Sequence, residues 1–364
     1  MRVEIEKEDL LNASLTIQSA ISTRTTLPIL ANVLVETQSS GLTLTATDLD
    51  IGICATVCAN VLDEGSLTIP ARKFGEIIKA LPPGKVLLAA RKNNSFTIES
   101  GQSVCRLLGI PKEEFPKIPE LENAAEVRMN ASRLKELVAL TSIAMSHDET
   151  RYVLNGILLE LRGKELRLVA TDGRRMALVR EELEKPFKDS KRVIIPVKAV
   201  NELSRMLGEC ETVGIRFAEG QIGFWSENTS IVARLVDGEF PDYEKVVPPE
   251  AKQKVTVNTE NFLSAVRRAS VFTTPDSQSV RIEVRSDRLI LLKNTPSLGE
   301  LREEIAAEYA GGEFSIGFNP GYLIDVLKNI KDETLELELV ASDKPGVIRL
   351  EDRYVYIVLP MQLS

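Results

Sequence analysis

The chain has 364 residues, with 45 lysines and arginines against 53 aspartates and glutamates, 43% hydrophobic residues and 5% aromatic residues. This length suggests two or three domains of ordinary size, and this composition is that of a globular protein rather than a disordered or fibrous one. The charged N-terminus lacks the apolar core of a secretory signal, and no apolar run approaches the roughly 18 residues of a membrane span, so we expect a cytoplasmic protein.

Few residues are suited to enzyme chemistry. His147 is the single histidine, which excludes two-histidine metal motifs, and the sequence has no phosphate-binding loop, dinucleotide-binding motif or nucleophile elbow. The four cysteines form no C-x-x-C pair, and we expect them to be small buried apolar residues. Asp48, Asp50 and Asp172 leave open a carboxylate-based or metal-dependent hydrolase. However, Asp48 and Asp172 each close an alternating apolar strand, where aspartate commonly forms a turn with its own backbone.

In chain order, the same sequence of elements occurs three times. Each repeat begins with a helical spacing of apolar residues, and short strands separated by turn residues follow it. A strand then leads through a proline into a second amphipathic helix, and Pro70, Pro196 and Pro320 lie about 126 and 124 residues apart. Proline suits the first turn of a helix because its missing N–H would have no partner there, and Asn319 is a good N-cap before Pro320. After a first helix near Leu10 to Ile21, helices are predicted at 71–81, 131–146, 197–207, 259–271 and 320–331.

The repeat divides the chain into three domains of about 120 residues, at 1–120, 126–246 and 253–364, with polar, proline-containing linkers near 117–125 and 244–253. Short strands joined by tight connections favour antiparallel sheets with the helices on one face. The predicted fold class is therefore α+β, in which each repeated domain has two helices on one face of antiparallel sheets.

Charge is distributed unevenly over these elements, although the net charge is -8. Five of the six predicted helices are net positive, and for any one helix this could reflect only that lysine and arginine are good helix formers. Five helices of one sign in an acidic protein favour a basic face instead. If the helices share one side, that side could contact phosphates without reading bases.

Seven stretches, spread over the whole chain, carry a resemblance to a known family: Arg24–Leu30, Pro70–Phe74, Arg151–Gly156, Val169–Arg175, Leu235–Tyr243, Ile316–Asn319 and Leu359–Leu363. In these stretches the chain resembles the bacterial sliding clamps, the family of the DNA polymerase III beta subunit. The resemblance implies a head-to-tail homodimeric ring of six clamp domains, which encircles duplex DNA without sequence specificity and acts as the processivity factor of the replicative polymerase. It also implies no catalytic activity, and with it no catalytic residue, cofactor or metal.

The dimensions of helices agree with two copies in such a ring. Six helices, each about 10 Å wide, would enclose a hole of roughly 9 Å, whereas twelve would leave about 28 Å. A duplex roughly 20 Å across passes only through the larger hole. One chain therefore cannot encircle DNA, but two can.

The resemblance further implies two sets of binding residues. Those for DNA are Arg24, Arg72, Lys73 and Lys198, and Asp148 stands where some relatives have a DNA-contacting glutamine. A groove between the second and third domains would bind short linear peptides of the polymerase, the clamp loader and other replication and repair proteins. Its residues would be Leu154, Thr171, Gly173, Arg174, Arg175, Met176, Pro241, Lys245, Val246, Tyr322, Val358, Pro360 and Met361. Arg174 stands where many relatives have histidine, and Gln362 where arginine is frequent, so the preferred peptide is expected to differ.

Ring closure would pair the end of domain one with domain three of the partner. The residues implied are Lys73, Arg106, Leu107 and Leu108 on one side, and Val271, Phe272, Glu300, Glu303 and Glu304 on the other. Basic against acidic groups around an apolar centre suits a head-to-tail interface, although Glu300 to Glu304 could also be a solvated acidic strand. Two other functions stay open at this point, namely the hydrolase and a scaffold whose repeated domains bind only proteins.

Overall fold

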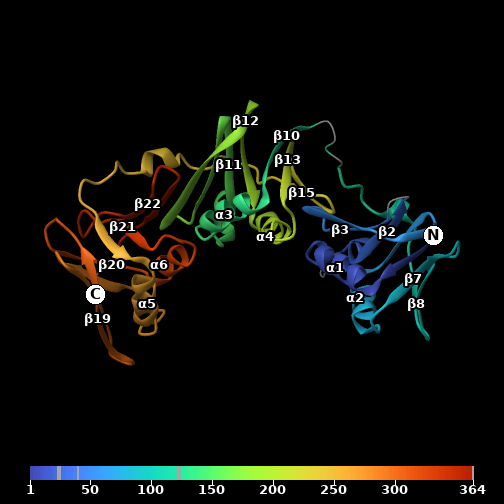
Figure 1. Ribbon diagram of the computed structural model, residues 1–364, viewed down its shortest axis with the longest axis horizontal. Helices are drawn as coiled ribbons and strands as arrows, with labels where there is room; N and C mark the ends of the chain where they lie inside the picture. The colour runs from blue at the N-terminus through green and yellow to red at the C-terminus, as the bar shows by residue number, and fades with distance from the viewer. Residues whose placement is uncertain (23–25, 39–40, 120, 122–123, 363–364) are drawn as a thin grey trace. The chain divides into compact units, whose positions relative to one another are not determined.

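A computed structural model of the chain describes residues 1–22, 26–38, 41–119, 121 and 124–362 (Figure 1). The chain forms two compact units, one of Met1–Ser132 with Asn201–Leu235 and one of Arg133–Val200 with Val236–Ser364. The second predicted domain contributes residues to both units. No helix among the described residues is long and apolar enough to span a membrane.

The first unit contains two antiparallel sheets. Their strands are β1 (Arg2–Glu6), β2 (Asn32–Gln38), β3 (Gly41–Thr47), β4 (Ile51–Val57), β5 (Asn60–Asp63), β6 (Gly65–Pro70), β7 (Lys85–Ala90), β8 (Ser95–Ser100), β9 (Ser103–Leu108), β10 (Ala125–Asn130), β13 (Thr212–Ala218), β14 (Gln221–Trp225) and β15 (Thr229–Arg234). One sheet has the order β5-β1-β7-β8-β9 and the other β10-β13-β14-β15-β4-β3-β2-β6. Helix α1 (Lys7–Ile17) packs on β3 and β4, and helix α2 (Ala71–Ala80) packs beside it on β2 and β6.

The larger sheet of this unit continues from the first predicted domain into the second. The continuation is made by β4 and β15, which pair antiparallel with Ile53 opposite Ile231. Both isoleucines are 1% exposed. The alternating apolar residues of β4 and β15 therefore pack at the junction between two predicted domains as well as in the core of each.

The second unit contains one sheet of ten strands in the order β11-β12-β23-β22-β21-β16-β19-β18-β17-β20. The strands are β11 (Gly156–Thr171), β12 (Arg175–Pro196), β16 (Val255–Asn258), β17 (Val280–Val284), β18 (Arg288–Thr295), β19 (Gly299–Glu308), β20 (Phe314–Phe318), β21 (Thr334–Glu338), β22 (Gly346–Leu350) and β23 (Tyr354–Val358). Here β12 pairs antiparallel with β23, with Met176 opposite Ile357, and carries the sheet from the second predicted domain into the third. Helices α5 (Thr259–Ser270) and α6 (Pro320–Leu327) pack together.

Helices α3 (Ala131–Ser142) and α4 (Val197–Met206) each have residues in both units. With them, all six predicted helices are present. Each ends one to four residues before its predicted end. In α3 and α6, which each end four residues early, the last turns tighten: Ala144 N–H bonds to the carbonyl of Thr141, and Asn329 N–H to that of Val326. The mixture of helices and antiparallel sheets confirms the α+β prediction.

The helix starts and the cysteines test two smaller expectations. Asn319 accepts a hydrogen bond from Gly321 N–H at 2.9 Å and caps α6, whose first turn contains Pro320 as predicted. Pro70 and Pro196 differ, since each is the last residue of a strand, β6 or β12, just before the helix. The expectation that the cysteines are buried is wrong: the side chain of one is exposed and three are half-buried, because they lie at strand faces and helix ends outside the core (Cys58; Cys54, Cys105 and Cys210).

Candidate functional site

The turn between β11 and β12 places Arg175 where two predicted domains meet. Asp172 Oδ1 accepts hydrogen bonds from the N–H groups of Arg174 at 2.8 Å and Arg175 at 3.0 Å. Gly173 has a φ of +83°, and a β-carbon there would lie 2.9 Å from an arginine side-chain nitrogen, so the turn requires glycine. The aspartate therefore forms the turn that its position after the strand predicts.

Asp48 does the same after β3, which weakens the hydrolase hypothesis. Its Oδ1 accepts hydrogen bonds from Asp50 N–H at 3.1 Å and Ile51 N–H at 2.9 Å. Within the described ranges, no three or more His, Cys, Asp and Glu side chains gather to hold a metal ion. The carboxylates of Asp48 and Asp172, two of the three acids that suggested catalysis, are thus occupied in turns.

The Arg175 side chain joins the start of β12 to helix α6. Its Nε donates to Asp172 Oδ2 at 3.0 Å, and one terminal nitrogen donates to Asp325 Oδ2 at 2.7 Å. The guanidinium carbon also lies 4.3 Å from the ring centre of Tyr322. The side chain is 11% exposed. Burial alone would lower the pKa of Arg175, but Tyr356 and the two carboxylates outweigh this effect and raise that pKa. The side chain of Arg175 therefore stays positively charged.

A second contact between strand and helix comes from Tyr356 on β23. Its hydroxyl donates to the backbone carbonyl of Tyr322 at 2.9 Å. The Tyr356 side chain is fully buried, and this burial raises the pKa of its phenol. Tyr322 is therefore held through its carbonyl by Tyr356 and through its ring by Arg175.

The chain after β23 runs past both of these groups. Leu359 N–H donates to the carbonyl of Arg174 at 2.9 Å, and Met361 N–H donates to that of Gly317 at 2.8 Å. Pro360 and Met361 are only half-buried, and Leu359 is 45% exposed. The C-terminal segment thus connects the β11–β12 turn to the end of β20, with apolar side chains that reach solvent.

A buried core lies beneath the surface formed by Arg175, Tyr322 and residues 359–361. It comprises Leu154, Leu158, Val169, Met176, Leu178, Ile194, Phe240, Tyr243, Val347, Val355 and Ile357. Two predicted groove residues, Leu154 at 7% and Met176 at 4% exposure, belong to this core, and Val358 is 2% exposed. These three side chains form the base of the surface rather than its exposed part.

Tyr243 fixes a further wall of the surface. Its hydroxyl donates to Glu160 Oε2 at 2.5 Å, and this carboxylate is 1% exposed and also lies 3.2 Å from Arg192 Nε. Burial, with Glu160 beside it, raises the pKa of Tyr243. Tyr243 begins the short 3-10 helix Tyr243–Val246, so the linker predicted at 244–253 starts as ordered structure. Val246 in this helix is 60% exposed.

The structure therefore brings together most of the predicted groove residues in the second unit. Buried or half-buried members are Leu154, Thr171, Arg175, Met176, Tyr322, Val358, Pro360 and Met361, and exposed members are Gly173, Arg174, Pro241, Lys245 and Val246. Sequence reasoning missed Asp325 and Tyr356. Asp325 could have been predicted, because Asp325 lies three residues after Tyr322 on a predicted helix and therefore on the same helix face.

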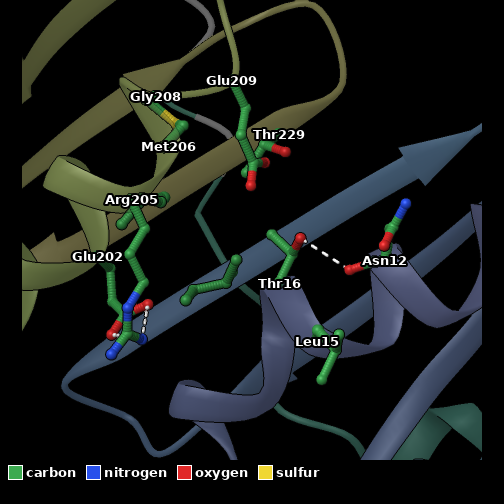
Figure 2. A pocket seen from close by; sticks show the side chains of 11 residues that line it. Asn12, Leu15, Thr16, Glu202, Arg205, Met206, Gly208, Glu209 and Thr229 are labelled. Carbon is green, nitrogen blue, oxygen red and sulfur yellow. Dashed lines mark hydrogen bonds and ion pairs between the residues drawn. The ribbon is translucent and has the colours of Figure 1, made fainter. Parts of the chain in front are cut away.

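A cavity of about 700 Å³ lies in the first unit and shares no residue with this surface. Figure 2 shows it between α1 and α4, above the paired strands β4 and β15. Its lining includes Leu15, which is 56% exposed, and Glu202, which is 6% exposed and bonded to Arg205. The gap marks the place where two helices on one sheet do not fill the space between them.

The predicted DNA contacts are placed only in part. Arg72 and Lys73 project from α2 with side chains 87% and 67% exposed, and both bond to Glu76, at 3.1 Å and 2.8 Å. Hydrogen bonds from Lys73 and Arg72 lower the pKa of Glu76. Lys198 is exposed in the first turn of α4, whereas Arg24 lies outside the described residues.

Asp148 is engaged in capping. Its Oδ1 accepts from Thr150 N–H at 3.0 Å and from the Thr150 hydroxyl at 2.6 Å, and its Oδ2 lies 3.1 Å from Arg151 Nε. The hydrogen bonds from Thr150, and then from Arg151, lower the pKa of Asp148. This carboxylate starts the 3-10 helix Glu149–Leu154 that leads to β11.

The predicted interface residues lie on strand β9 and helix α2 of the first unit, and on strand β19 and just after helix α5 of the second. Arg106, Leu107 and Leu108 lie on β9, and Leu108 is 76% exposed. In the second unit, Val271 directly follows α5 and is 73% exposed. The glutamates lie on β19, where Glu303 already bonds to Arg268 and Glu304 to Arg288, and Lys73 and Phe272 complete the set.

Comparison with known proteins gives matches along the whole chain. Residues 1–119, 128–242 and 244–362 match the N-terminal, central and C-terminal domains of the DNA polymerase III beta subunit. The chain is 34% identical over 363 residues to the beta sliding clamp of Chlamydia trachomatis, covering 100% of this chain and 87% of that one.

Two solved structures are also similar over 100% of both chains. The DNA polymerase sliding clamp of Bacillus subtilis has a TM-score of 0.95 at 30% identity. A sliding clamp of Pseudomonas aeruginosa bound to griselimycin has a TM-score of 0.94 at 33% identity. Each predicted repeat thus matches its own domain description.

Proposed function

This chain belongs to the family of the DNA polymerase III beta subunit, the bacterial sliding clamps, and we propose that two copies of it close head to tail into a ring around duplex DNA. Membership makes the chain a DNA sliding clamp and a non-catalytic subunit, the processivity factor of the replicative polymerase. The ring, its contacts and its partners are the proposal.

The observation that carries the ring is a sheet junction that recurs with the domain period. β4 pairs with β15 at the first junction, and β12 pairs with β23 at the second. Strands β4, β12 and β19 begin about 124 residues apart along the chain. Strands β9, β15 and β23 begin about 125 residues apart. A third junction of the same kind would pair β19 with β9. In a head-to-tail dimer each copy supplies one of these two strands at each interface, and two such interfaces close the ring.

Both strands offer an edge for this pairing. β9 is the last strand of its five-stranded sheet, and its Val104 and Leu108 are 63% and 76% exposed. β19 pairs with β18 along its length but with β16 only at Ala307 and Glu308. Edge strands with exposed apolar side chains invite pairing with another chain, so proteins seldom leave them uncovered.

The apolar residues carry more of the proposed interface than the charges do. Glu303 and Glu304 bond to arginines of their own chain, and Lys73 bonds to Glu76. New ion pairs across the interface would have to replace these existing ones, which leaves little net gain. The proposed interface comprises Lys73, Arg106, Leu107 and Leu108 against Val271, Phe272, Glu300, Glu303 and Glu304, with its leucines, valine and phenylalanine at the centre.

For DNA, we assign weak phosphate contacts to Arg24, Arg72, Lys73 and Lys198. A closed ring is retained by topology, so few contacts suffice, and contacts to phosphates alone permit sliding. Because Glu76 neutralises part of the charge of Arg72 and Lys73, their hold on the duplex would be loose. These residues would slow escape of DNA very little when the ring is open.

The surface around Arg175 is the proposed binding groove for linear peptides. Exposed Val246 and half-buried Tyr322, Pro360 and Met361 offer apolar contacts, and Arg174 and Lys245 add positive charge at the edge. An extended peptide with one or two apolar anchors and an acidic position fits this chemistry. The proteins that carry this peptide would be the polymerase catalytic subunit, the clamp loader and repair proteins, acting in the cytoplasm.

The domain limits that we assign to the chain are 1–120, 126–246 and 253–364.

The topological claim has a direct test. The chain is loaded onto nicked circular DNA with a bacterial clamp loader, and the circle is then cut once with a restriction enzyme. The proposal expects stable retention on the circle and rapid loss after linearisation. Equal retention on both forms would contradict encirclement and favour ordinary surface binding.

The groove assignment has its own test. Deletion of 360–364 is expected to abolish stimulation of the replicative polymerase while the protein still closes into rings. Unchanged stimulation would overturn the assignment, and a loss of rings would show that the segment serves folding instead.

A further inference from the structure

Lys293 is a buried cation that the sliding-clamp function does not explain. It lies in β18, and its side chain is 6% exposed. Its ammonium nitrogen lies 2.8 Å from the carbonyl oxygen of Ser277, 2.6 Å from the Ser277 hydroxyl and 2.9 Å from the carbonyl oxygen of Ser279. A lysine has three N–H donors, and all three have acceptors here.

These acceptors are neutral oxygens, which makes the arrangement unusual. Lysine is almost never fully buried unless it is paired, because removal of the ammonium from water is costly. Burial accordingly lowers the pKa of Lys293. The three hydrogen bonds of this buried ammonium hold the backbone that carries their acceptors, and these acceptors belong to one segment of the chain.

That segment is 271–279, which connects α5 to β17. Thr274 and Ser277 close a turn within it through two backbone hydrogen bonds, of 3.2 Å and 3.0 Å. Its other end is held from the same strand, since Thr295 Oγ1 donates to the carbonyl of Phe272 at 2.5 Å. Lys293 and Thr295 are two residues apart on β18, so both point to the same face of the sheet.

The far side of this segment belongs to the proposed subunit interface. Val271 is 73% exposed, and the ring of Phe272 lies 3.8 Å from the β-carbon position of Gly299. Gly299 is the first residue of β19, the strand proposed to pair with the partner's edge. Lys293 and Thr295 therefore hold Val271 and Phe272 in place next to that strand from inside the domain.

We propose that Lys293, assisted by Thr295, is a positioning residue for ring closure: it fastens the 271–279 segment so that Val271 and Phe272 are preformed for the partner subunit. This inference rests on the proposed ring. A segment already ordered in the free subunit loses less conformational freedom when the interface forms, and this strengthens association without a new contact across it. Lys293 would thus act on the lifetime of the closed ring while buried away from the partner.

The test compares full-length Lys293→Met with Lys344→Met, a matched change at a lysine that is 61% exposed in the same predicted domain. The dimer dissociation constant is measured by sedimentation over a range of concentrations, and amide hydrogen exchange is followed over 271–279. We expect Lys293→Met to weaken the dimer tenfold or more and to speed exchange in that segment, with both quantities unchanged in Lys344→Met. Faster exchange with an unchanged dissociation constant would overturn the inference, because the fastening would then be only local.

Thr295→Val keeps the test decisive if Lys293→Met does not fold. It removes the hydroxyl that holds Phe272 and is nearly isosteric, so we expect it to fold and to weaken the dimer about threefold or more. A dissociation constant equal to that of the unsubstituted chain would count against the inference. A wild-type chain that stays monomeric at every concentration would instead refute the ring itself, so the two failures are distinguishable.

Discussion

Arg175→Ala should separate strand β12 from helix α6 and so loosen the junction that carries the proposed groove. The substitution removes hydrogen bonds of 3.0 Å to Asp172 and 2.7 Å to Asp325. A hydrogen bond to a charged group contributes about 1.5–3 kcal/mol. The Asp325 side chain is 41% exposed and can be rehydrated, and Asp172 is 16% exposed but keeps its hydrogen bonds from the N–H groups of residues 174 and 175, so the lower value applies to both bonds. The expected loss in the free energy of unfolding is about 3 kcal/mol.

The loss is measured by thermal unfolding and by peptide binding. For a unit of roughly 200 residues, 1 kcal/mol lowers the midpoint by about 2–4 °C, so a fall of about 6–12 °C is expected. Peptide affinity should fall about tenfold or more, because the ring of Tyr322 loses its contact with the guanidinium, 4.3 Å away. Arg174→Ala is the control for stability: its side chain is exposed, and a surface change of this kind alters stability by about 0.5 kcal/mol at most. A midpoint for Arg175→Ala within about 1 °C of the control would refute the role given to Arg175.

Three other substitutions test separate parts of the structure. Tyr243→Phe should cost about 1.5–3 kcal/mol in denaturant unfolding, because it leaves the buried carboxylate of Glu160 without the hydroxyl 2.5 Å away; no measurable cost would contradict this. The pKa of Glu126 is lowered from its ordinary value near 4.5 by hydrogen bonds from two arginines, foremost Arg128. The contribution of Glu126 to stability is therefore complete above pH 4.5 and is lost as pH falls through the lowered pKa. The difference in the free energy of unfolding between wild type and Glu126→Gln should thus shrink on acidification. A difference that grows on acidification would contradict this reasoning. Leu108→Asp should weaken the dimer by about a hundredfold without altering monomer unfolding, since that side chain is 76% exposed, and a dimer of unchanged affinity would place the interface elsewhere.

The repeat explains why so much of the fold could be predicted. Apolar periodicity and proline spacing report elements and their order directly, and the α+β class and six helices followed from them. Side-chain partners across the chain are not encoded in spacing. The bond between Arg175 and Asp325 joins residues 150 positions apart, and nothing in either local stretch identifies the other. The same holds for Lys293, whose position in an apolar strand gives no sign of the serine oxygens that it binds.

The turn-forming role of Asp172 was predictable because it depends on backbone N–H groups only two and three residues further along the chain. The exposure of Cys58 was not, since cysteine composition says nothing of which strand face a residue occupies. Helix ends were missed by up to four residues, because the tightened last turns depend on packing beyond the helix itself. The predicted interface set remains a prediction, as does the groove.

The most direct test of the ring is the mass and shape of the purified protein in solution. Light scattering should give roughly 80 kDa, twice the 40.2 kDa of one chain. Negative-stain images of the same sample should show a two-fold ring with a central hole wider than a DNA duplex. A compact particle of 40 kDa without a hole, at every concentration, would contradict the account, because a single open chain cannot be retained on DNA by topology.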